Sequence, residues 1–210
     1  MLGVAGRIDE AREAIADMNR KWPDNRDVIF KAVEFTVESQ QPPFTRALAL
    51  LDDPDLRSYY ERPPIGKPGA IDALRVALRA RIGSPEDKRK AAQVVEKSVL
   101  EGAIPPFSGL AVLASLGDVD GAFRTADRVL TDEYIRRSFG EHIIYFLFGA
   151  QASALRRDPR FMPLMQRLGL IDYWRSSGHW PDFCSEPELP YDCKAVAAKL
   201  AATASPSARH

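Results

Sequence analysis

The feature that most constrains the fold of this chain is the regular interruption of helix-forming sequence by proline and glycine. Windows rich in Ala, Leu, Arg, Glu and Lys, which favour helices, fill most of the 210 residues. Proline ends such windows because it lacks an amide donor and restricts the residue before it. The breaks that carry Pro or Gly lie at residues 22–25, 41–43, 62–64, 83–85, 104–106 and 116–118. We therefore expect short helices joined by tight turns.

Apolar periodicity predicts helices throughout and no strand, since no convincing alternating run of five or more residues occurs. The predicted helices span residues 8–20, 27–39, 44–51, 55–60, 69–81, 85–101, 106–115, 119–130, 132–138, 141–155, 159–168, 170–177 and 192–202. Ser108 and Gly109 are interpreted as turn residues, and the acids Asp118 and Asp120 as caps or turns. An all-α array of helix hairpins is the expected fold class.

A short helix near the C-terminal end has both of its ends specified. Asp158 can accept the free amides of a first turn, and Pro159 suits the first helical position. Apolar residues then recur at three- and four-residue steps, which predicts one apolar face over residues 159–168. Gly169 follows as a left-handed stop. The residues of the apolar face are Phe161, Leu164, Met165 and Leu168.

This segment resembles the closing part of tetratricopeptide-type arrays at the C-terminal end of bacterial winged-helix regulators. The resemblance is close over residues 150–184, including the run from Leu155 to Trp174 and the Trp-Pro-Asp-Phe-Cys run at 180–184. It implies a module that binds and senses and has no active site. The module would be the sensing or assembly part of a transcriptional regulator whose DNA-binding half lies outside these residues.

Glycine spacing agrees with such a repeat. Gly6 precedes Ala11 by five residues, and Gly117 precedes Ala122 by five residues. This spacing is typical of a glycine in the turn between two helices, followed by a small residue where the second helix packs on the first. Gly83 lies 34 residues before Gly117, which equals the tetratricopeptide period of about 34, but Lys88 and not alanine follows it by five residues. The array is therefore expected to be irregular. We predict a right-handed solenoid of helix hairpins over residues 1–202, with 150–184 as its closing segment. The small, polar residues 203–210 are expected to form a disordered tail.

Charge and length exclude several classes of protein. Twenty-nine basic residues balance 29 acidic ones, which argues against direct nucleic-acid contact over a broad surface. No apolar run approaches the 18 residues or so of a membrane span, and the first residues lack the blocks of a signal peptide. Residues 6–11 read as the middle of a helix pair, so the chain could be a fragment of a longer one or a naturally short protein.

Catalytic and metal sites find little support in the sequence. His142 follows Glu141, but neighbours in a helix point to different sides and do not form an acid–base pair. His179, Cys184 and Cys193 could offer three ligands to zinc, although a closed site needs four. Phosphate-binding, dinucleotide-binding, nucleophile-elbow and zinc-protease motifs are absent from the sequence. We therefore predict no catalytic, cofactor or metal residues.

Cys184 and Cys193 are the two cysteines of the chain and flank a loop that contains prolines. They could form a disulfide in an oxidising compartment, with a stabilisation of about 2–3 kcal/mol. They could equally remain reduced, partly buried thiols in the cytosol. The compartment, cytoplasmic or periplasmic, therefore stays open at this point.

Aromatic and basic residues are the candidates for contact with a partner. Such side chains dominate binding hot spots, although more often they pack inside or cover solvated helix faces. The basic pair Arg156 and Arg157 could likewise contact an acidic peptide or lie on a solvated helix face. The expected partner is a protein or peptide segment or a small ligand, and a homodimer is compatible with this. The alternatives are a stand-alone adaptor or chaperone-like scaffold, and an all-α enzyme with a pocket lined by His142 or His179. The candidate partner-binding residues are Tyr59, Tyr60, Tyr134, Arg136, Arg137 and Tyr145.

Overall fold

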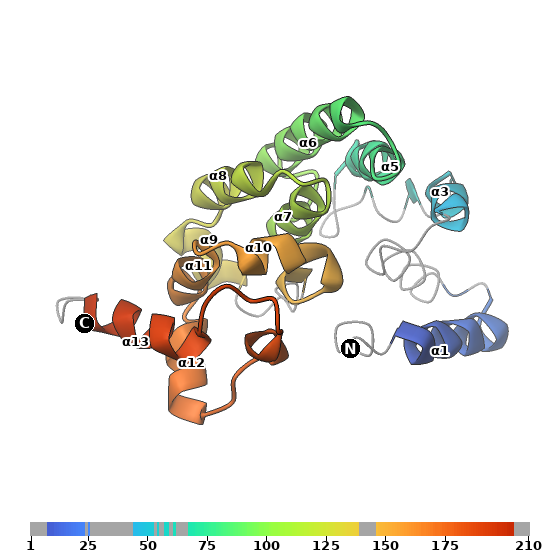
Figure 1. Cartoon of the computed structure of the whole chain (residues 1–210). Helices are drawn as coiled ribbons and strands as arrows, with labels where there is room; N and C mark the ends of the chain where they lie inside the picture. The colour runs from blue at the N-terminus through green and yellow to red at the C-terminus, as the bar shows by residue number, and fades with distance from the viewer. Residues whose placement is uncertain are drawn as a thin grey trace. The chain divides into compact units, whose positions relative to one another are not determined.

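The computed structural model describes residues 8–23, 25, 44–52, 54, 57–58, 61, 67–138 and 146–203. Every regular element in these ranges is a helix, so the all-α prediction is confirmed for the part of the chain described (Figure 1). The chain divides into two compact units, Met1–Ser153 and Ala154–His210. Each unit buries apolar side chains of its own.

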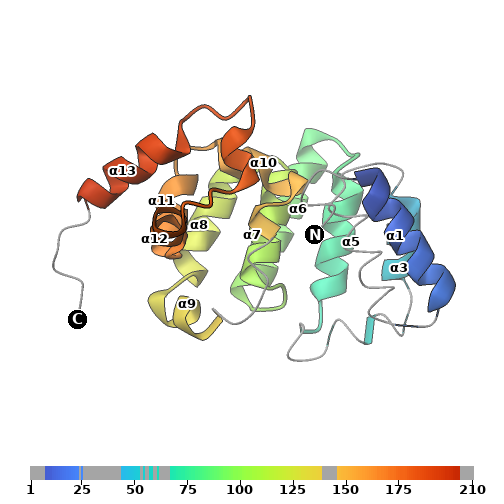
Figure 2. The same ribbon diagram turned by 90° about the horizontal axis from the view of Figure 1, so that it is seen from below.

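In the described residues of the first unit, two helix hairpins are stacked. Its elements are α1 (Ile8–Lys21), α3 (Thr45–Leu51), α5 (Ala70–Ala80), α6 (Pro85–Leu100), α7 (Pro106–Ser115), α8 (Val119–Val129), α9 (Asp132–Ser138) and the short 3-10 helix η2 (Ala150–Ala152). α5 packs against α6, and α7 packs against α8 (Figure 2). α6 also contacts both α7 and α8, which joins the two hairpins into one stack. α3 packs on α5.

Tight turns with defined caps join the two helices of each hairpin. Before α6, the Ser84 hydroxyl accepts a hydrogen bond from the Asp87 amide at 3.2 Å, and the Asp87 carboxylate accepts one from the Ser84 amide at 2.9 Å. Before α8, Gly117 has a φ of 86°, a left-handed conformation that glycine adopts without strain. The Asp118 carboxylate then accepts the Gly121 amide at 2.9 Å, which confirms its interpretation as a cap.

Residues 34 positions apart touch each other in this stack. Arg81, which follows α5, donates from Nε to Oγ of Ser115 at the end of α7, at 3.2 Å. Lys67, which precedes α5, donates from Nζ to the backbone carbonyl of Glu101, which precedes α7, also at 3.2 Å. Both pairs are separated by 34 residues in the sequence. The two hairpins are therefore stacked with corresponding ends of α5 and α7 adjacent.

The two hairpins approach each other closely at Gly109 in α7. A Cβ built at this glycine would lie 2.1 Å from Cγ2 of Val99 in α6, which is far inside van der Waals contact. Only a residue without a side chain allows the helices to come this close. The interpretation of Ser108 and Gly109 as turn residues is therefore wrong, because both lie inside α7 and the glycine serves helix packing.

α7 is enclosed by its own chain along its length. Between Phe107 and Ala114, every residue except Ser108 is buried. α6 and α8 cover α7, and so does η2, which returns to it after α9. Leu147 and Ala152, on either side of the η2 start, are both fully buried. The helix therefore presents almost no surface to a partner.

The second unit is built around α11. Its elements are α10 (Ser153–Arg157), α11 (Phe161–Arg167), α12 (Leu170–Ser177), the 3-10 helix η3 (Asp182–Ser185) and α13 (Cys193–Thr203). α11 contacts both α12 and α13. The predicted apolar face is confirmed, since all four of its residues are buried. Phe183 from η3 packs edge-on against Phe161 at 5.4 Å and against Trp174 at 6.0 Å between ring centroids.

Most predicted helix bounds agree with the structure to within two residues, but the prediction of a single helix over residues 141–155 is wrong. Residues 141–155 were expected as one helix. Within their described part, 3-10 turns and a bend precede α10, and Gly149 has extended backbone with a ψ of 162°. Glycine has poor helix propensity, and here its extended backbone interrupts the helical hydrogen bonds. This allows the chain to turn back onto α7.

The start of α11 also differs from its prediction. The helix begins at Phe161, two residues after the expected position, and Pro159 lies in the preceding turn. The Asp158 carboxylate accepts a hydrogen bond from the Arg160 amide at 2.9 Å. It also accepts hydrogen bonds from Nε and Nη2 of the Arg160 guanidinium, at 2.8 and 2.7 Å. Asp158 therefore organises the turn before the helix and does not cap its first turn. Gly169 does end α11 in a left-handed conformation, with a φ of 73°, as predicted.

Several predictions fall outside the described residues. These are the helix at 27–39, most of that at 55–60, the turn at Gly6 and the tail from residue 204 onward. Thr203, which was assigned to the tail, is the last residue of α13. Of the two glycine turns with a following alanine, the described one has Gly117 at the turn and a fully buried Ala122 in α8.

Candidate functional site

The residues predicted to contact a partner are not gathered into one site by the described part of the structure. Tyr59, Tyr60 and Tyr145 lie outside the described residues, and the side chains of Arg136 and Arg137 in α9 do as well. Tyr134 is half-buried, and its ring lies 6.3 Å from that of Phe107 at the start of α7. For Tyr134, then, the structure shows packing within the first unit.

The histidines also form no site in the described ranges. His142 lies outside them. His179 is exposed, and its amide donates to Oγ of Ser177 at 3.2 Å. Within the part of the chain that the structure describes, no group of three or more His, Cys, Asp or Glu side chains is placed to hold a metal ion. The two cysteines that could have joined His179 are bonded to each other.

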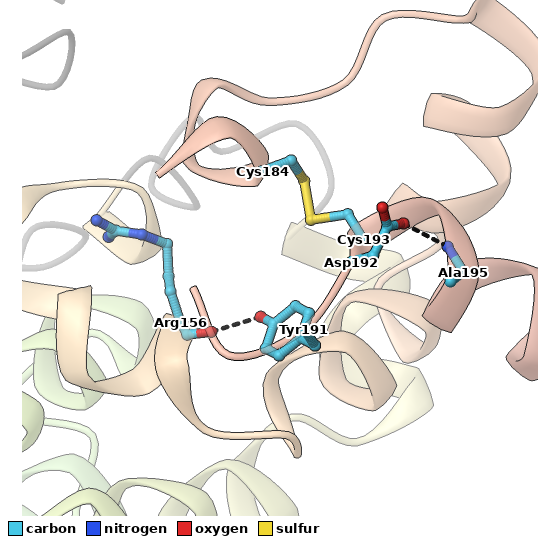
Figure 3. The surroundings of a disulfide bond; sticks show 6 residues. All are labelled: Arg156, Cys184, Tyr191, Asp192, Cys193 and Ala195. Carbon is cyan, nitrogen blue, oxygen red and sulfur yellow. Dashed lines mark hydrogen bonds between the residues drawn. A yellow bond between two sulfur atoms is a disulfide. The ribbon is translucent and has the colours of Figure 1, made fainter. Parts of the chain in front are cut away.

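Cys184 and Cys193 form a disulfide that links η3 to the first residue of α13 (Figure 3). Their Cα atoms are 5.7 Å apart, an ordinary separation for such a bond. Cys193 is buried and Cys184 is half-buried. The bond closes the segment from 184 to 193, called here the bridged loop.

Two ion pairs hold the bridged loop to α10. Arg156 donates to the Glu186 carboxylate at 2.8 Å, and Arg157 donates to that of Glu188 at 2.5 Å. The Arg156 side chain is only 4% exposed, and its guanidinium carbon lies 5.9 Å from the centroid of the Phe183 ring. A buried arginine requires such a partner, because an isolated charge is costly to remove from water. The basic pair is thus engaged by acidic residues of the same chain.

Tyr191 and Asp192 fix the far end of the bridged loop. The Tyr191 hydroxyl donates a hydrogen bond to the backbone carbonyl of Arg156 (Figure 3). Burial raises the pKa of the Tyr191 phenol above its usual value, so the hydroxyl keeps its proton and its role as donor. The Asp192 carboxylate accepts the Ala195 amide at 2.7 Å and caps α13. The loop is therefore fixed at both ends as well as through its acids.

Sequence reasoning identified the two cysteines but missed what the loop between them contacts. The signal was present in the sequence, since Glu186 and Glu188 carry the charge opposite to that of Arg156 and Arg157. Pairing them required the return of the chain from η3 toward α10, which no local pattern specifies. The disulfide is the group in this arrangement that thiol–disulfide exchange can change.

A second candidate surface lies on α5. Asp72, Val76 and Arg79 are exposed at helical spacing and are called here the α5 stripe. Val76 is 40% exposed, and Ile82, which follows the helix, is 69% exposed. Arg75, beside the stripe, is held by the carboxylates of Asp52 at 2.6 Å and Asp72 at 3.0 Å. The stripe thus places the apolar Val76 between the acid Asp72 and the cation Arg79 on a helix that is fixed in place.

Comparison with known proteins adds no assignment to these surfaces. No family model matches the chain, and no curated protein or solved structure matches it at a significant level. Among the described helices, none combines the length and apolar character that crossing a bilayer requires.

Proposed function

We propose that the chain is a non-enzymatic binding module whose hairpins form a tetratricopeptide-like, right-handed superhelix. The observation that carries this proposal is the contact between positions 34 residues apart at both ends of α5 and α7. A period of about 34 residues built from helix pairs is typical of tetratricopeptide arrays. Stacked repeats of this kind commonly bind partners through the extended surface that their helices present.

The partner surface is proposed to be the α5 stripe. α7 is covered along its length by α6, α8 and η2, so it offers little area. The α5 stripe offers exposed Val76 beside Arg79, with Ile82 just beyond the helix. An apolar side chain next to a cation suits a peptide segment that carries an apolar anchor and a carboxylate.

Selection of displayed peptides on the intact chain tests this proposal. Enriched peptides are expected to carry an acidic residue beside an apolar one. Arg79→Glu should weaken their binding about tenfold or more, because like charges then meet at the interface. Arg128→Glu is the matched control, since Arg128 is also an exposed basic residue in the last turn of a helix, α8. A selection without enriched peptides, or equal weakening by both variants, would contradict the proposal.

We further propose that the module senses or assembles within a bacterial transcriptional regulator. Support comes from the resemblance of residues 150–184 to the closing segment of such proteins. The balanced charge of the chain suits a part that leaves DNA contact to another domain. Sequencing the transcript that encodes the chain checks this, and a winged-helix segment in the same reading frame is expected. A transcript without one would favour a stand-alone adaptor or chaperone-like scaffold.

A further inference from the structure

α13 is held to the second unit by few apolar contacts. The whole helix is described, and of its 11 residues only Cys193 and Ala197 are buried. Five of its 11 residues are alanine and two are lysine, and its larger apolar side chains, Val196 and Leu200, are only half-buried. A helix of this length is marginally stable in water without packing. The disulfide at Cys193 therefore adds a covalent attachment to a helix whose non-covalent contact with α11 buries few of its residues fully.

The rest of the second unit is held independently of that bond. Phe161, Trp174 and Phe183 pack against one another between α11, α12 and η3. The bridged loop is additionally fastened to α10 through Glu186 and Tyr191. These contacts remain available when the sulfur–sulfur bond is broken. After loss of the bond, the loop up to Tyr191 would stay attached to α10. The helix α13, which follows the loop, would lose its covalent attachment to η3.

We propose that the Cys184–Cys193 bond is a redox-operated latch for α13, which a dithiol reductant opens without unfolding the α11–α12 core. Cys184 is half-buried in η3, whereas Cys193 is buried at the start of α13, so the incoming thiolate attacks Sγ of Cys184. The sulfur–sulfur bond breaks, and Cys193 leaves as a thiolate that takes up a proton. The second thiol of the reductant then displaces Cys184. Two electrons and two protons pass to the chain, and the reductant becomes a disulfide.

Opening the latch removes the constraint that closes the bridged loop and so raises the conformational freedom of the segment after Tyr191. Asp192 still caps the first turn of α13 through the Ala195 amide, but the covalent link to η3 is gone. Release of the helix uncovers the part of α11 against which α13 packs in the closed form. The latch would thereby give the second unit two states that differ in the accessible surface of α11. This inference does not depend on the proposed partner surface on α5.

Limited trypsin cleavage of the full chain, with and without a 1,4-dithiol, tests the latch. Lys194 and Lys199 are exposed residues of α13, and Arg175 is an exposed residue of α12 that serves as the internal control. Reduction is expected to raise the cleavage rate at Lys199 about tenfold or more, because proteolysis follows local opening. Cleavage at Arg175 should change less than about twofold, and removal of the dithiol with reoxidation should restore protection.

The double variant Cys184→Ser/Cys193→Ser separates the latch from a direct effect of the reductant. It should be cleaved at Lys199 at the rate of the reduced wild type, with and without dithiol. An unchanged rate at Lys199 on reduction would show that α13 is held without the bond. An equal rise at Lys199 and Arg175 would show that the bond maintains the whole unit. Either result overturns the proposal.

Discussion

Gly109 shows how a single residue sets the distance between the two hairpins. The absence of a side chain lets α7 approach Val99 of α6, and Val99 is itself buried and β-branched. A β-branched side chain in a helix has essentially one rotamer, so Val99 cannot turn away from an added methyl group. The stack must therefore open slightly to accept any residue larger than glycine here.

Gly109→Ala is expected to destabilise the first unit by about 1–3 kcal/mol, because the new methyl group overpacks the contact with Val99. Helix propensity alone would predict the opposite sign, a gain of about 1 kcal/mol. Ser108→Ala, at the neighbouring and half-buried position, is the control and should change stability little. Urea denaturation followed by circular dichroism measures both variants. A Gly109→Ala protein more stable than the wild type would show that the hairpins can move apart freely.

At the scale of elements, side-chain caps fix the first turns of α6, α8 and α13. Asp118 caps α8 directly after the left-handed Gly117. Asp192 caps α13 by accepting the Ala195 amide. Such caps satisfy amides that have no partner inside the helix. They also explain why many helix bounds could be predicted from the sequence, since proline, glycine and capping acids act within a few residues.

Asp118→Ala should cost about 1 kcal/mol of stability, because the Gly121 amide loses its acceptor. Asp118→Asn keeps a side-chain oxygen at the same position and should retain most of the wild-type stability. Thermal unfolding of both variants at equal protein concentration checks the prediction. If the two variants melt together below the wild type, the negative charge and not the cap would be the stabilising feature.

Contacts between elements that are distant in the sequence could not be predicted from local patterns. The helical pattern of residues 141–155 is apolar enough to continue as one helix, and its interruption at Gly149 depends on the packing of η2 against α7. The same holds for Arg156, whose burial depends on Glu186, 30 residues away in the sequence. In the candidate site, the cysteines were visible as a pair, whereas their redox state and the fastening of the loop depend on tertiary contacts.

At the scale of the whole molecule, the division into two compact units predicts two cooperative unfolding events. Leu164→Ala removes a buried side chain of α11 and should cost the second unit about 2–5 kcal/mol. Leu113→Ala does the same to α7 in the first unit. Hydrogen exchange in graded urea should show each variant lowering amide protection in its own unit only. A parallel loss of protection throughout the chain would show that the two units unfold as one.

The enclosure of α7 has a consequence during synthesis of the chain. α7 carries no charged side chain, and η2, which completes its cover, ends at Ala152. Ribosomes add about 5–20 residues per second, so about 37 further residues after Ser115 take about 2–7 s to appear. For that time the nascent chain lacks η2, so the cover of this uncharged, apolar helix is incomplete. We expect a chaperone that binds exposed apolar segments to distinguish two kinds of ribosome-bound chain. It should engage chains whose part outside the ribosome ends before residue 146 more strongly than chains whose part outside extends past residue 152.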